Sequence, residues 1–145
     1  NAIVVAADTT VVADAISIAD FNTAADQVAV DSSFTSGVTT VASAAASASN
    51  IDNAAFILMT STLNDPTSLA GITSAIGTVG GATAGDDAFY AINNSAGTKA
   101  YIYSITLNAA VAGALNTVDT DDDISLVAVL TLTGGALAVG DMTMY

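Results

Sequence analysis

Apolar and polar residues alternate over several short stretches of the chain, which is the pattern of half-buried β-strands. The alternation runs through residues 16–21, stops at an Asn-Thr-Ala-Ala link and resumes at residues 28–30 between two aspartates. β-Branched residues are dense in residues 2–14, where Val-Val-Ala-Ala-Asp is followed by Val-Val-Ala-Asp. This stretch predicts further short strands, with Asp8 and Asp14 near their ends. These strands form either an ordinary edge hairpin or an arm that pairs with a neighbouring subunit.

The middle of the chain carries one strand signal and two helix signals. Residues 38–49 are rich in Ala and Ser and contain no Gly or Pro, so we expect a helix there. The apolar residues within 53–61 predict a buried strand. Residues 64–81 have the punctuation of a second helix, with Asp65 as its N-cap, Pro66 at its first position and a glycine pair at its end.

The last third of the chain reads as strands. Residues 87–93 and 99–107 alternate around a glycine-containing turn, which predicts a β-hairpin. Residues 123–145 predict a further strand region that turns at a glycine pair. We therefore expect a mainly β fold, a β-sandwich or β-roll-like arrangement of antiparallel sheets with one or two short helices, in a single domain spanning 1–145.

The charge balance narrows the classes of partner. Lys and Arg together number 1 against 14 acidic residues, all of them Asp, and the net charge is −13. A chain without a basic patch cannot release counterions from phosphate, which excludes nucleic-acid binding and disfavours anionic membranes. The longest apolar run is too short for a transmembrane segment.

The surface composition is also unusual. Hydrophobic residues make up 52% of the chain, enough to fold, but only 10% of residues are charged, against roughly 25% in soluble domains. The surface must then consist of Thr, Ser, Asn, Ala and Gly. Surfaces of this kind are typical of extracellular and self-associating bacterial proteins, and an extracellular or cell-surface location is expected.

The chain offers little for covalent catalysis. It contains no His, Cys, Glu, Arg or Trp, which removes Ser-His-Asp and Cys-His arrangements and a histidine general base. Lys99, the only cation, precedes the aromatic strand of the predicted hairpin and is expected to be solvated. We therefore expect no enzymatic activity.

Two aspartate groups are candidate metal ligands. Asp86 and Asp87 follow a glycine-rich stretch that is like a degraded copy of the Gly/Asp nonapeptide of Ca²⁺-binding β-rolls. A single copy cannot stack into a roll, so a polar turn is the alternative explanation.

The second group is Asp119, Asp121 and Asp123, whose alternate spacing can direct several carboxylate oxygens to a hard cation such as Ca²⁺. The EF-hand pattern then fails, because Ile124 and Leu130 stand where glycine and glutamate are required. A solvated loop that binds no ion is the alternative to Ca²⁺ binding at these residues.

Residues 16–33, ISIADFNTAADQVAVDSS, resemble a segment near the C-termini of RTX-type proteins, the acidic calcium-binding bacterial proteins exported by type I secretion. That pattern is an apolar residue, Asp-Phe, a short link, Asp and then alternating apolar residues. The matching residues, in order, are Ile18, Asp20, Phe21, Asp26, Val28 and Val30.

Later parts of the chain are similar to later elements of the same family. Residues 85–105 look like its hairpin, and residues 118–145 look like its Asp-rich loop, apolar strand and Asp-plus-apolar end. The tandem glycine-rich repeat array of the family is absent from this chain. The resemblance implies an exported protein whose C-terminal region carries secretion information, in a family that includes surface-layer proteins, adhesins and toxins.

Two functions follow as hypotheses. The first is a structural protein that self-assembles outside the cell into a filament or surface layer, with residues 1–14 as a strand arm donated to a neighbouring copy. The partners are then copies of the chain itself, with other cell-surface or matrix components as further candidates. The second is a monomeric Ca²⁺-responsive secretion or capping module at the end of a larger exported protein.

Overall fold

The computed structural model of the chain describes residues 2–5, 15–35, 38–81, 83–108, 115–118 and 122–145. These residues form three β-sheets, one α-helix and two short 3₁₀ helices, so the expectation of a mainly β fold with a short helix is confirmed. Among the nine strand pairs in these ranges, six are parallel and three antiparallel. The expectation of antiparallel sheets is therefore wrong, because only Asp87–Asn93 and Lys99–Thr106 pair as a hairpin and the other pairs join strands that are not consecutive in the chain.

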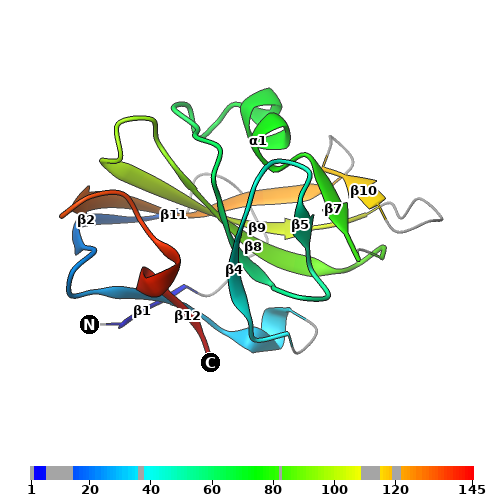
Figure 1. Cartoon of the computed structure of the whole chain (residues 1–145), viewed down its shortest axis with the longest axis horizontal. Coiled ribbons are helices and arrows are strands. Elements are labelled where there is room, and N and C mark those ends of the chain that lie inside the picture. Colours follow the sequence, from blue (N-terminus) through cyan, green and yellow to red (C-terminus); the bar gives the residue numbers. More distant parts are fainter. Residues whose placement is uncertain (1, 6–14, 36–37, 82, 109–114, 119–121) are drawn as a thin grey trace.

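The largest sheet has six strands and organises the rest of the molecule (Figure 1). Its strands, in spatial order, are β2 (Ile16–Asn22), β11 (Asp123–Thr133), β9 (Lys99–Thr106), β8 (Asp87–Asn93), β6 (Phe56–Met59) and β4 (Val41–Ala44). Only β9 is antiparallel to its neighbours, and the other five strands all run in one direction.

Two three-stranded sheets lie beside the large one (Figure 1). The first has the order β1 (Ala2–Val5), β3 (Gln27–Val30) and β12 (Met142–Met144), all parallel. The second has the order β10 (Leu115–Thr117), β7 (Thr78–Gly80) and β5 (Ser49–Asn50). The helices are η2 (Ser32–Phe34), α1 (Leu69–Ile76) and η3 (Val139–Asp141).

Both faces of the large sheet are buried over its central strands, whereas β2 at one end is mostly exposed. Side chains alternate along β8, so that Tyr90 packs in one apolar cluster and Phe89 in the other. The cluster around Tyr90 includes Ile76 of α1, so α1 covers that face. The cluster around Phe89 includes Val28 of β3 and Met142 of β12, so the first small sheet covers the opposite face. The core is therefore two apolar layers separated by one sheet.

The helix expected at residues 38–49 is wrong. This stretch forms β4, a turn and β5, because parallel pairing of β4 with β6 outweighs the helix propensity of alanine. The turn includes Ser47 at φ 60°, and the Ser47 N–H donates to the Ile76 carbonyl at 2.8 Å. Ser49 is buried, with its hydroxyl 3.3 Å from the Tyr90 hydroxyl.

The helix expected within residues 64–81 is present but shorter, since α1 covers only Leu69–Ile76. Its N-cap is Ser68, whose hydroxyl accepts from Gly71 N–H at 3.1 Å, and not Asp65. Asp65 instead accepts from the N–H and hydroxyl of Thr67, which forms a turn before the helix. The helix ends at Gly77, whose φ of 70° favours glycine.

The strand expected at residues 53–61 is confirmed as β6, all four residues of which are buried. The hairpin of β8 and β9 is also confirmed, and its turn is closed by Asn94, whose side-chain oxygen accepts from Thr98 and Lys99 N–H groups. No helix in the described ranges is long and apolar enough to span a membrane.

The position of Lys99 makes the fold testable with trypsin. Lys99 is the only Lys or Arg in the chain, and its backbone lies in β9 between β8 and β11. Cleavage after Lys99 requires unfolding of a central strand, so we expect the folded chain to resist trypsin. In denaturant, trypsin should give two fragments, residues 1–99 and 100–145, as measured by mass spectrometry. Rapid cleavage of the folded chain would contradict this strand order.

Candidate functional site

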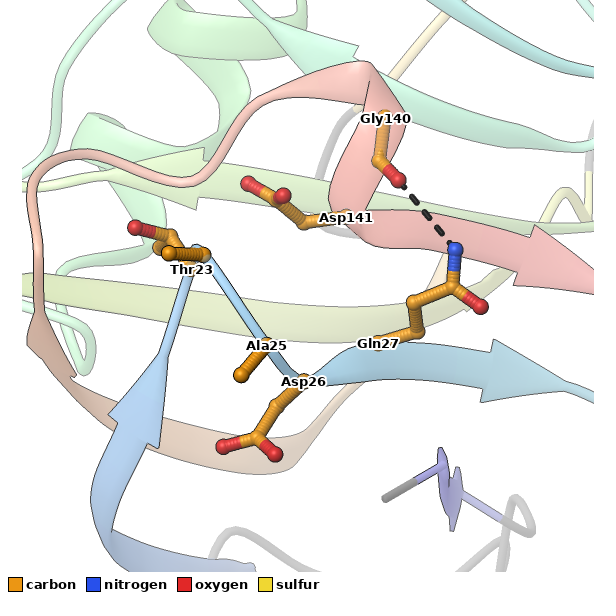
Figure 2. Close-up of a pocket in the computed structure, with 7 residues that line it drawn as sticks. Thr23, Ala25, Asp26, Gln27, Gly140 and Asp141 are labelled. Atoms are coloured by element: carbon orange, nitrogen blue, oxygen red, sulfur yellow. Dashed lines mark hydrogen bonds between the residues drawn. The ribbon is translucent and has the colours of Figure 1, made fainter.

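An open depression of about 300 Å³ lies where the link between β2 and β3 meets the turn before β12 (Figure 2). It is lined by residues from two segments that are far apart in the chain. These residues are Thr23, Ala24, Ala25, Asp26, Gln27, Gly140 and Asp141.

Hydrogen bonds fix the carboxylates of Asp26 and Asp141 and join the two segments that line the depression. Asp26 accepts from Asn22 N–H at 2.9 Å, and this backbone hydrogen bond holds the pKa of Asp26 below its ordinary value. Asp141 accepts from Ala138 N–H at 2.8 Å. Across the depression, the Gln27 side-chain N–H donates to the Gly140 carbonyl at 3.3 Å (Figure 2).

Sequence reasoning missed this juxtaposition. Each aspartate precedes a short strand with alternating apolar residues, and those strands pair in parallel with Val28 opposite Met142. The sequence contains one signal for it, since Asp26 and Asp141 are each followed by alternating apolar residues. Two carboxylates at an open surface can attract a cation, and the hydroxyl of Thr23, which also lines the depression, donates to the Thr133 carbonyl.

The first predicted metal-ligand group, Asp86 and Asp87, is engaged in local hydrogen bonds. Asp86 accepts from the N–H of Thr83 at 2.6 Å and from its hydroxyl at 2.7 Å, which closes a turn. Asp87 accepts from the Thr106 hydroxyl across the β8–β9 pair. These bonds fit the polar turn that the sequence also allowed.

The second group is only partly described. Asp119 and Asp121 lie outside the described residues, and Asp123 is the first residue of β11, opposite Thr106. Within the described ranges, no three acidic side chains gather closely enough to hold a metal ion together. Ca²⁺ binding by Asp119, Asp121 and Asp123 stays a prediction.

Many of the described aspartates share a structural role, since each accepts a hydrogen bond from a backbone N–H nearby in the chain or across a loop. The short Asp side chain reaches such groups more readily than Glu does, which gives a physical reason for the all-Asp composition. The aspartates with this bond are Asp26, Asp31, Asp65, Asp86, Asp122 and Asp141.

The buried tyrosines also have structural roles. Burial raises the pKa of Tyr90 to about 12, and burial raises the pKa of Tyr103 as well. Both phenols therefore stay protonated near neutral pH, and the Tyr103 hydroxyl donates to the Pro66 carbonyl at 2.9 Å. Lys99 has an exposed side chain, as expected.

Comparison of the chain with protein-family models, curated proteins and solved structures gave no match.

The aspartate hydrogen bonds predict acid sensitivity. Backbone and side-chain hydrogen bonds hold the pKa values of Asp26, Asp31 and Asp65 below the ordinary 3.8. A lowered folded-state pKa stabilises the fold above the unfolded-state pKa, and this stability is lost as pH falls through the folded-state value. We expect the melting temperature to stay nearly constant from neutral pH to about pH 5 and to fall below about pH 4.

A triple variant, D26N/D31N/D65N, should lower the melting temperature at pH 7 and weaken its fall in acid. The control variant D20N/D52N/D123N has the same net charge. Equal acid dependence of both variants, measured by circular dichroism, would show that these three hydrogen bonds are not the cause.

Proposed function

We propose that this chain is a non-enzymatic structural protein that works outside the bacterial cell and assembles with copies of itself through β-strand contacts into a filament or surface layer. The observation that carries the proposal is the set of strands at the ends of the three sheets in the described residues, none of which contains Lys or Pro.

Those end strands are β2 and β4 in the large sheet, β1 and β12 in the first small sheet, and β10 and β5 in the second. Natural proteins commonly protect such edges with Lys or Pro. The only Lys, Lys99, lies in the central strand β9, and the only Pro, Pro66, precedes α1. Neither residue can protect an edge in this fold.

The surface chemistry supports contact between copies. Residues 32–51, which contain β4 and β5, carry no charged side chain. The central strands of the large sheet use their backbone N–H and C=O groups in pairing with neighbours on both sides, so the groups open to another chain lie at its edges. A contact made there needs no catalytic side chain, in keeping with the lack of His, Cys and Arg.

The net charge of −13 opposes this assembly, because every copy repels the next. Salt reduces that repulsion, since the Debye length falls from about 30 Å at 0.01 M to about 8 Å at 0.15 M ionic strength. Assembly is therefore expected to depend on ionic strength, whether the added cation is monovalent or divalent.

The alternative is a monomeric Ca²⁺-responsive secretion or capping module of a larger type I-secreted protein. The spacing of Asp119, Asp121 and Asp123 favours this function, because Ca²⁺ prefers several carboxylate oxygens in one loop. If folding is coupled to Ca²⁺, the bound ion stabilises the folded state by mass action.

The proposed self-assembly is tested with the full chain at increasing NaCl concentration in the presence of EGTA. We expect the sedimentable fraction to increase several-fold between 0.01 M and 0.15 M salt, because screening permits contact. Negative-stain microscopy of the pellet should show fibres or sheets. Dispersed single particles at high protein concentration under every salt condition would contradict the proposed function.

The second prediction separates the two functions. A self-assembling chain should melt within a few degrees of the same temperature in EGTA and in millimolar Ca²⁺ at matched ionic strength. A large Ca²⁺-dependent increase in the melting temperature of a monomer, followed by scanning calorimetry and light scattering, would favour the secretion or capping module. Mg²⁺ at the same concentration serves as the control for divalent screening.

A further inference from the structure

We infer that the contact between copies is head to tail along the large sheet, with β4 of one copy paired to β2 of the next. This inference rests on the proposed function and names the surfaces that carry it. The large sheet then continues through the assembly.

Strand direction permits this contact. β2, at one end of the sheet, and β4, at the other end, run in the same direction. A second copy that is shifted along the sheet without being inverted therefore presents its β2 parallel to β4. Both strands already take part in parallel pairs, β2 with β11 and β4 with β6, so the new pair continues an existing pattern.

The backbone of β4 has hydrogen-bonding groups on its open side. The carbonyls of Thr40 and Ala44 accept from N–H groups of the β6 segment, and bonding residues alternate along a parallel ladder. The intervening residues Val41 and Ser43 therefore direct their N–H and C=O groups away from β6. Ser43 has an exposed side chain.

Space and charge also favour contact at β4. The strand has the sequence Val-Ala-Ser-Ala, and the small side chains of Ala42, Ser43 and Ala44 leave room for an approaching backbone. The strand belongs to the uncharged stretch 32–51, so no charged side chain of this segment opposes a negatively charged copy.

The β2 edge presents an exposed apolar group. Ile16, at the start of β2, is 46% exposed, and Ser17 is also exposed. The β2–β11 register shifts between Leu130 and Leu132, so β2 is irregular near Asp20. A bulge weakens edge pairing, which places the contact at the regular residues 16–18.

Charge does not oppose the head-to-tail contact. β2 carries Asp20 and β4 carries no charged side chain, so no two charged side chains meet across the paired strands. A head-to-tail contact also leaves one free edge at each end, so that growth does not close. Six strands at about 4.8 Å give a rise of about 29 Å per copy.

The N-terminal arm is not required for this contact. The structure pairs β1 with β3 of its own chain, from Ala2 opposite Gln27 to Val5 opposite Val30. An arm donated to another copy would have to leave this pairing first, whereas the open sides of β2 and β4 have no other strand paired to them within the described residues.

The absence of cysteine from the chain permits a direct test by site-specific cross-linking. Three variants each carry one exposed Ser→Cys substitution: S17C on β2, S43C on β4 and S74C on α1. They are assembled in salt, treated with a short bis-maleimide that tolerates a small change of register, and examined on denaturing gels. S74C is the matched control away from both edges.

We expect an equimolar mixture of S17C and S43C to give covalent dimers and the double variant S17C/S43C to give a ladder of polymers. S43C alone, and S17C mixed with S74C, should give at least several-fold less product. Strong cross-linking of S43C to itself would instead indicate a symmetric β4 contact and would overturn the inference.

Two further outcomes separate this inference from the proposed function. Polymers that sediment normally but give no S17C–S43C product would overturn the edge contact and leave self-assembly intact. Absence of polymers in the wild-type chain would overturn both. Deletion of residues 1–14 should leave the polymers and the cross-link in place; conversion to monomers, with the fold retained by circular dichroism, would assign the contact to the arm.

Discussion

The large sheet is buried on both faces, and this constraint organises the molecule. Phe89 and Tyr90 point to opposite sides of β8, so each face needs its own cover. α1 with the second small sheet supplies one cover, and the first small sheet supplies the other. Because the central strands are paired on both sides, the described part of this sheet has open backbone groups at its end strands, β2 and β4. The proposed assembly uses those edges.

The aspartates have structural roles because the chain has almost no cationic side chains to pair with them. With a single lysine against 14 aspartates, most carboxylates have no cationic side chain to pair with, and several accept hydrogen bonds from backbone N–H groups. Asp26 and Asp141 do so on either side of the depression, where β3 and β12 begin. The acids thus stabilise turns locally, while their uncompensated charge is expected to oppose contact between copies at low ionic strength.

The sequence correctly predicted the elements that are determined by interactions between residues close together in the chain. The apolar run at β6 and the alternation around Gly97 gave a buried strand and a hairpin, both confirmed. The Ala/Ser-rich stretch predicted a helix, and this prediction was wrong. The stretch contains strand β4, which is determined by pairing with the distant segment β6. Asp65 and Ser68 are both good caps, and the sequence does not say which one begins α1. The depression was missed because parallel pairing of β3 with β12 joins segments about 113 residues apart.

Amide hydrogen exchange at the two edges, followed residue by residue as the protein concentration is raised, tests the central claim most directly. If copies join along the large sheet, the outward amides of Val41 and Ser43 exchange rapidly in the dilute monomer. They become protected in the assembled state, together with amides among residues 16–18, while amides in the Asp65–Thr67 turn are unchanged. Edge amides that exchange equally fast in dilute and concentrated samples would contradict the account.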